Sequence, residues 1–264
     1  IRDAQESRGL GDVYKRQFDM SSEEITAAHE KLHSEGTAVQ QLSKVFRVYG
    51  RCPEEQTLLV QISTIPNIRF LFSQAKRWFL LRNRTPLNHL EHLGWIKKEA
   101  LYDNGRNRYR YYMHSVIAAA IRAQFIDDLY DLCQGFIHEI TIEMTSSLSQ
   151  NDATKKELIQ FSWSLNDIFH GQFQSEEDSD FLWALAEIYR DIGYYERALP
   201  LLDSLDTLYC QLYGEGNIKL ASVWNSRGMI QYELSHFPAA LDAYQTSPVS
   251  YTHLRAHETP EHLV

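Results

Sequence analysis

The sequence predicts a mainly α-helical protein that contains one small β-hairpin. Apolar residues recur at helical spacing along most of the chain. One short segment instead has two apolar runs on either side of Asp103-Asn104-Gly105, residues that favour a tight turn between strands. Near the carboxyl end, a helical pattern repeats when the sequence is shifted by 42 residues. These observations favour helices and a hairpin followed by an array of helical pairs.

The two ends of the chain can be encoded by one DNA sequence read on opposite strands. Codons for Ser7–Gln17 give, on the complementary strand, the residues Val249–Glu258. Selection for a folded protein does not act on an inverted repeat that exists only in the DNA. We therefore expect residues 1–17 and 248–264 to derive from a transposase sequencing adapter, and residues 18–247 to be a piece of a longer reading frame. Both ends are left out of the fold prediction.

Composition indicates a globular protein. The apolar fraction of 44% is enough for a good core, and the length allows one large or two ordinary domains. No apolar run approaches the ~18 residues needed to span a bilayer, so no membrane partner is expected. Cys52, Cys133 and Cys210 are far apart and odd in number, which favours a reducing, cytoplasmic location over a disulfide framework.

The first half of the chain predicts three helices in succession. From Glu54, apolar residues recur at helical spacing until Pro66 closes the run. The segment 68–81, "IRFLFSQAKRWFLL", predicts a second helix. A third begins with Thr85 as the N-cap and Pro86 at the first helical position.

The period then changes from that of a helix to that of a strand. The segment "WIKKEALYDNGRNRYRYYMH" predicts a β-hairpin that turns at Asp103-Asn104-Gly105. Three helices followed by a hairpin is the winged-helix order, so residues 51–122 are expected to form a winged helix, preceded by a helical segment at 18–50. The alternative is an unrelated helical patch with a surface hairpin.

The segments "LNHLEHLGWIKKE" and "RYRYYMHSVIAAAIRAQ" resemble the last subdomain of the NB-ARC nucleotide-binding module, a branch of the STAND signalling ATPases. In that family the second hairpin strand ends in Met-His-Asp or a Met-His-Pro-like motif, whereas this chain has Met113-His114-Ser115. The resemblance implies that His114 lies against the β-phosphate of bound ADP and holds a closed, inactive state. An imidazole can donate one hydrogen bond to phosphate while its other nitrogen is fixed by the protein. The alternative is that His114 caps the strand-to-helix junction.

The sequence contains no G-x-x-x-x-G-K-[ST] phosphate-binding loop. We therefore expect no enzymatic activity from this chain alone. ADP or ATP is expected to bind only in the full-length parent, whose upstream nucleotide-binding domain would be a partner of this chain.

The 42-residue shift lays "LWALAEIYRDIGYYERALPLL" over "WNSRGMIQYELSHFPAALDAY", with large residues over large and small over small. The pattern resembles the tetratricopeptide repeat, in the longer form of kinesin light chains and bacterial NB-ARC proteins. Repeats are expected at 176–247, and a helical connector or degenerate repeats at 123–175. The resemblance implies that the first helix of each pair lines a groove for a protein or peptide ligand, with the residues Trp183, Glu187, Arg190, Asn225, Met229 and Tyr232. The alternative is that some of these side chains pack against the neighbouring hairpin.

Two histidine patterns suggest metal binding. "HEKLH", His29–His33, matches the zinc-protease pattern with Glu30 available as a base, and makes a zinc metalloprotease the distant alternative. Its short, charged surroundings favour a solvated helix. His89 and His92 lie three residues apart with no further ligand at a suitable spacing, so we expect surface imidazoles and no metal.

Two functions remain open. The preferred hypothesis is the lid of an ADP/ATP-dependent signalling switch joined to a repeat-based, protein-binding sensor. The runner-up is a winged-helix DNA-binding regulator, because the segment from Arg69 to Arg110 contains ten Lys or Arg and only three acidic residues. Against DNA binding, the third helix has no Arg or Lys before Lys97. The DNA contacts would come from Arg82, Arg84, Lys97, Lys98 and Arg106.

Overall fold

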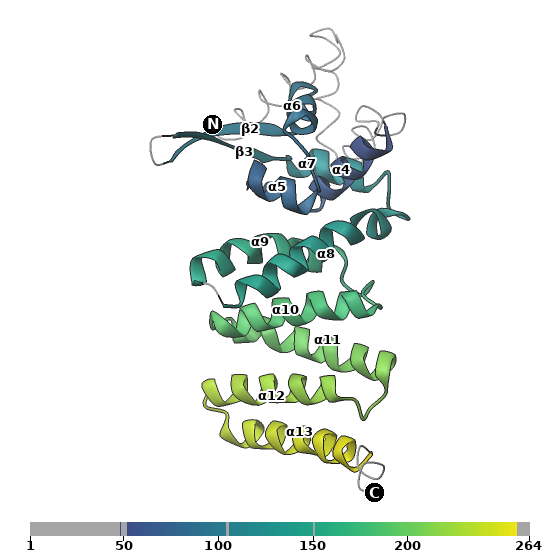
Figure 1. Cartoon of the computed structure of the whole chain (residues 1–264), viewed down its shortest axis with the longest axis vertical. Coiled ribbons are helices and arrows are strands. Elements are labelled where there is room, and N and C mark those ends of the chain that lie inside the picture. The colour runs from purple at the N-terminus through teal and green to yellow at the C-terminus, as the bar shows by residue number, and fades with distance from the viewer. Residues whose placement is uncertain (1–47, 49–51, 104–105, 150, 258–264) are drawn as a thin grey trace, which may run out of the picture. The chain divides into compact units, whose positions relative to one another are not determined.

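The structure of the chain is a computed structural model that describes residues 48, 52–103, 106–149 and 151–257 (Figure 1). The predictions for residues 1–17, for most of 18–50 and for the HEKLH segment lie outside these residues. The chain divides into two compact units, Ile1–Glu139 and Ile140–Val264, which are described separately below. The described residues are mainly helical with one small antiparallel sheet, which confirms the predicted fold class.

The first unit contains a three-stranded sheet and short helices (Figure 1). Its elements, in chain order, are α4 (Pro53–Ser63), β1 (Phe70–Leu71), α5 (Phe72–Trp78), α6 (Thr85–His92), β2 (Lys97–Asp103), β3 (Arg106–Tyr112), α7 (Ser115–Arg122) and the first part of α8 (Leu129–Ser147). Helix α4 ends at Ser63, two residues before Ile65, the last apolar residue of the run that predicted it. Helix α6 begins at Thr85 with Arg84 as its N-cap, one residue earlier than predicted.

The predicted hairpin is confirmed. Strands β2 and β3 pair antiparallel, from Lys97 opposite Tyr112 to Asp103 opposite Arg106. A third strand, β1, adds to the outer edge of β3 and gives the order β1-β3-β2.

The helix predicted over 68–81 is wrong at both ends. Phe70 and Leu71 form strand β1 because Phe70 is fully buried and pairs with Tyr111 of β3, with the two rings stacked at 6.2 Å. A strand partner some forty residues away leaves no periodic signal in the segment itself. The helix also ends early, at Trp78, because Leu80 adopts a left-handed backbone with φ of 52°.

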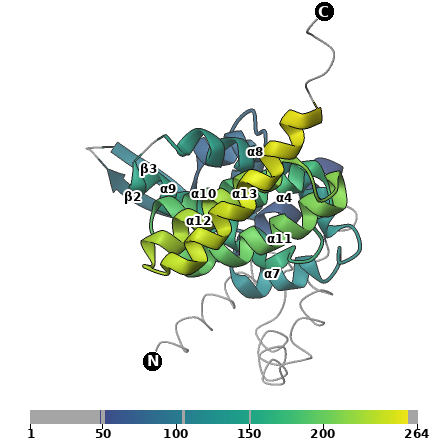
Figure 2. The ribbon, with the colours of Figure 1, turned by 90° about the horizontal axis from the view of Figure 1, so that it is seen from below.

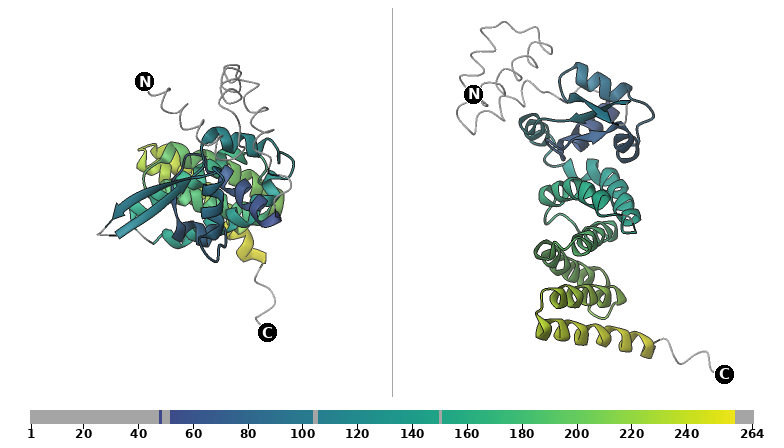
Figure 3. Two further views of the ribbon diagram at one scale, coloured as in Figure 1. Left: turned by 90° about the horizontal axis from the view of Figure 1, so that it is seen from above. Right: turned by 90° about the vertical axis from the view of Figure 1, so that its left-hand side faces the viewer.

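The second unit is built from successive helices (Figure 3, right). After the end of α8 come α9 (Asp152–Ile168), α10 (Glu176–Asp191), α11 (Tyr195–Tyr213), α12 (Ile218–Glu233) and α13 (Phe237–His257). The end view in Figure 2 shows α13 in front of α12, as the last described layer of this unit. Helix α13 runs to His257, so no helix end marks the predicted junction at residue 247.

Two helical hairpins in this unit repeat with the period seen in the sequence. Helices α10 and α12 begin 42 residues apart, at Glu176 and Ile218, and helices α11 and α13 begin 42 residues apart, at Tyr195 and Phe237. The caps are also equivalent, since Ser175 and Asn217 each accept a hydrogen bond from the backbone N–H three residues on. The sequence repeat is therefore a structural repeat.

The turn inside each hairpin is the same left-handed turn. Gly193 and Ser235 have φ values of 81° and 61°, and the residue after each donates its N–H to a carbonyl five residues back. Glycine accepts this backbone without strain, whereas serine does not.

We expect Ser235→Gly to raise the free energy of unfolding by about 0.5–1 kcal/mol, because it removes left-handed strain from a residue with a Cβ atom. Gly193→Ser should lower it by about 1 kcal/mol for the same reason. Urea unfolding of both variants beside the wild type measures the two effects. Changes of the same sign in both would contradict a shared turn.

Among the residues that the structure describes, no helix combines the length and the hydropathy needed to cross a membrane.

Candidate functional site

His114 lies at the junction of β3 and α7, where it is the N-cap of the helix. Its Nδ1 accepts a hydrogen bond from the Val116 N–H at 3.4 Å. Asn67 holds the same junction, since its Oδ1 accepts from the Ser115 N–H at 3.2 Å and its own N–H donates to the Met113 carbonyl at 2.8 Å. A neutral ring that accepts at Nδ1 carries its proton at Nε2. The capping role at the strand-to-helix junction is therefore observed.

The predicted groove residues occupy equivalent positions on the first helix of each hairpin. Trp183, Glu187 and Arg190 of α10 are partly buried, whereas their counterparts 42 residues on, Asn225, Met229 and Tyr232 of α12, are exposed. The structure therefore places the six residues on matching faces of α10 and α12, with different access to solvent.

A polar network holds two of the α10 residues, Glu187 and Arg190. The Arg190 guanidinium donates to Glu187 Oε1 at 2.7 Å and to Ser226 Oγ at 3.0 Å, and Ser226 Oγ donates to the same Glu187 oxygen at 2.9 Å. Arg190 also contacts Asp191 Oδ1 at 3.1 Å, and the other oxygen of Asp191 accepts from the buried Lys155 at 3.0 Å. The network joins α9, α10 and α12. Glu187 and Arg190 thus connect neighbouring helices.

Burial raises the pKa of the Glu187 carboxyl, while the charge of Arg190 and the Ser226 hydroxyl act in the opposite direction. The carboxylate is therefore held by internal partners in a partly desolvated place. A ligand would have to displace those partners to reach it.

The exposed part of the predicted groove continues across the turn into α13. Tyr232 is 58% exposed and packs edge-on against Phe237, which is 57% exposed, with ring centroids 5.6 Å apart. Met229 lies one helical turn before Tyr232 on α12, Leu241 lies one turn after Phe237 on α13, and both are exposed. We name Met229, Tyr232, Phe237 and Leu241 the apolar ridge. The counterparts of Phe237 and Leu241, 42 residues earlier in the chain, are Tyr195 and Leu199 of α11, which are partly buried.

The first unit has an exposed basic surface. Arg82 and Arg84 precede α6, and Lys97 and Lys98 begin β2; all four are exposed. Lys98 lies over the Tyr109 ring at 4.3 Å, and Arg84 lies over the Phe72 ring at 5.0 Å. The fifth predicted contact, Arg106, belongs to β3, but its side chain is outside the described residues.

An ion pair on the sheet moderates this basic character. Arg69 donates to Glu99 at 2.7 Å, which lowers the pKa of the Glu99 carboxyl and raises that of the Arg69 guanidinium. Both side chains are nearly half exposed, so the pair adds little stability.

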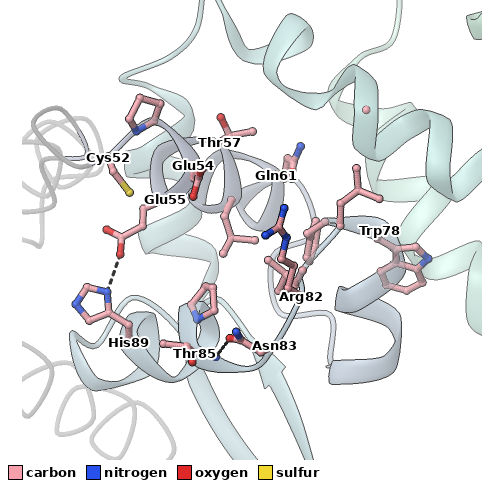
Figure 4. Close-up of a pocket in the computed structure, with 17 residues that line it drawn as sticks. Cys52, Glu54, Glu55, Thr57, Gln61, Trp78, Arg82, Asn83, Thr85 and His89 are labelled. Atoms are coloured by element: carbon pink, nitrogen blue, oxygen red, sulfur yellow. Dashed lines mark hydrogen bonds and ion pairs between the residues drawn. The ribbon is translucent and has the colours of Figure 1, made fainter.

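The first unit also contains a pocket of about 860 Å³ between α4, the segment 78–83 and the start of α6 (Figure 4). At one end of it, His89 Nδ1 contacts Glu55 Oε1 at 2.7 Å. His89 and His92 are both exposed, as expected for surface imidazoles. Within the described part of the chain, no group of three His, Cys, Asp or Glu side chains could hold a metal ion. No feature of the sequence pointed to this pocket.

Comparisons with protein-family models, with curated proteins and with solved structures gave no match to this chain.

Proposed function

We propose that the chain is a non-enzymatic part of a regulatory protein, in which the helical hairpins α10–α13 bind a protein or peptide and the first unit is a winged-helix lid of an ADP/ATP-dependent switch. The observation that carries the proposal is the 42-residue structural repeat, with equivalent helix starts, caps and turns. Stacked helical hairpins of this kind present extended surfaces for binding other proteins. The repeat supports a tetratricopeptide-like array.

The ligand surface of the array is its exposed part. Asn225 and the apolar ridge offer one amide and four large apolar side chains to solvent. Exposed apolar clusters with a polar border are typical of protein-binding sites. Glu187 and Arg190 act chiefly in packing, because both belong to the network that joins α9, α10 and α12.

The lid assignment draws on the order of elements and on His114. Helix, strand, two helices and a hairpin follow one another in the first unit, which is the winged-helix order with a short first strand. His114 lies where β3 meets α7, with its Nδ1 accepting from the Val116 amide. In this proposal, ADP favours the closed state, and a ligand on the array opens the switch by binding the open state more tightly. The chain works in the cytoplasm.

We expect peptides selected from a random library on the immobilised chain to lose at least about tenfold in affinity when Met229 or Tyr232 is replaced by serine, because each removes an apolar anchor. Ile142→Ser is the matched control, since Ile142 is a similarly exposed apolar residue on α8 of the same unit. Affinities measured by fluorescence anisotropy would contradict the proposal if all three variants bound alike.

The lid is tested in the coding sequence upstream of Phe18. A phosphate-binding loop there would support the nucleotide switch, and an open frame without one would remove its basis.

DNA binding is the second candidate, favoured by the exposed cations before α6 and on β2 together with the exposed rings of Tyr102 and Tyr109. Cations contact phosphates, and the helix α6 itself supplies no Arg or Lys for reading bases. Submicromolar, strongly salt-dependent binding to a duplex would place this candidate first.

A further inference from the structure

The pocket in the first unit has the size and lining of a small-molecule site. Its volume of about 860 Å³ lies within the range of roughly 300–1,000 Å³ typical of such sites. Leu58, Trp78 and Phe79 line it and are buried from solvent. Behind this wall, the Phe136 ring packs against Phe79 with centroids 4.8 Å apart, so the apolar side of the pocket is firmly supported.

Leu80 is held at the rim of this pocket by an unusual backbone conformation. Its φ of 52° is left-handed, a conformation that disfavours residues with a Cβ atom. The turn directs Trp78 and Phe79 into the core, and leaves the Leu80 side chain 71% exposed beside the pocket. Strained residues are concentrated at binding sites, because folding alone does not favour them. The cost of exposing this leucine is accounted for if an apolar ligand covers it.

The charges that line the pocket are of both signs but differ in their partners. Glu55 is in contact with His89 at 2.7 Å. Arg82 reaches from the segment 78–83 towards α4, beside Gln61 (Figure 4), and no hydrogen bond or ion pair connects it with another described residue. Glu54 is exposed at the start of α4. The guanidinium of Arg82 is therefore available to the anionic group of a ligand whose apolar part lies against Leu58, Trp78 and Phe79.

We propose that this pocket binds a small amphiphilic anion, with an aromatic or branched aliphatic body and a single carboxylate, sulfonate or phosphate group. The body covers Leu58, Trp78 and Leu80, and the anionic group pairs with Arg82, whose planar fork suits such oxyanions. Glu54 and Glu55, at the start of α4, exclude ligands with a second anionic group. The site is separate from the peptide-binding surface and from His114, so it does not rest on the function proposed above.

The test uses 8-anilinonaphthalene-1-sulfonate, an aromatic body with one sulfonate, titrated into the whole chain and followed by its fluorescence. We expect one site, an affinity about tenfold weaker in Arg82→Gln, and a comparable loss in Leu80→Ser. Glu54→Gln should tighten binding about twofold to fivefold, because it removes a repulsive charge. Lys97→Gln is the matched control, since it removes an exposed cation that does not line the pocket, and it should change nothing.

Several results would overturn this assignment. Unchanged binding in both Arg82→Gln and Leu80→Ser would place the dye elsewhere, and loss in Met229→Ser would place it on the apolar ridge. Binding of phenyltrimethylammonium that disappears in Glu54→Gln would show that the pocket takes cations. Because Leu80, Arg82 and Glu54 are exposed, their replacements should leave the circular dichroism spectrum and thermal midpoint unchanged, so a loss of dye binding reports on the site.

Discussion

Asp191→Ala is expected to lower the free energy of unfolding of the second unit by about 3 kcal/mol, because it leaves the ammonium of Lys155 buried without its partner. Lys155 has only 8% of its side chain exposed and donates to Asp191 at 3.0 Å. Asp191 also accepts from Arg190, so the substitution removes the negative partner of two cations at once. Urea unfolding followed by circular dichroism measures the change.

Two variants separate this effect from the general loss of a surface charge. Asp203 pairs with Arg227 at 2.6 Å, but 66% of the Asp203 side chain is exposed, so Asp203→Ala should cost less than about 1 kcal/mol. Lys155→Met in the Asp191→Ala background should restore most of the loss, because a buried methylene chain replaces the unpaired charge. If Asp191→Ala and Asp203→Ala cost the same, or if Lys155→Met fails to restore stability, the buried pair is not the cause.

Local sequence signals predicted the elements that depend on local chemistry. Asp103-Asn104-Gly105 located the hairpin because those residues accept turn geometry, and Pro66 lies shortly after the end of α4. The 42-residue shift located the hairpins of the second unit because large residues fell on large and small on small, as repeated helical hairpins require. Strand β1 was missed because its stability comes from pairing with β3, which a window around Phe70 does not contain.

The candidate sites were predictable to a smaller extent. Position in the repeat placed six residues on equivalent faces, but only the tertiary structure shows that Arg190 is tied to Ser226 of the next hairpin while its counterpart, Tyr232, is exposed. The resemblance singled out His114, and the structure adds the hydrogen bond that fixes its Nδ1. The sequence did not predict the pocket beside Leu80, because it does not distinguish a leucine with a left-handed backbone conformation from one in a helix.

At one pair of equivalent positions, the two helical hairpins of the second unit pack with different side chains. Gly228 of α12 and Tyr244 of α13 correspond, 42 residues earlier, to Ala186 of α10 and Leu202 of α11, both of which are buried. A Cβ atom added at Gly228 would lie 2.6 Å from Cε1 of the Tyr244 ring. The glycine is therefore required by the size of the tyrosine, since its own backbone is helical and accepts any residue.

We expect Gly228→Ala to lower the free energy of unfolding by about 2 kcal/mol, because overpacking against the Tyr244 ring outweighs the gain of about 1 kcal/mol in helix propensity. In the Tyr244→Leu background the same substitution should raise stability by about 0.5–1 kcal/mol, because the clash is gone and the propensity gain remains. Urea unfolding of the four proteins gives the coupling energy between the two sites. An alanine that destabilises both backgrounds equally would show that the ring of Tyr244 does not set the spacing of α12 and α13.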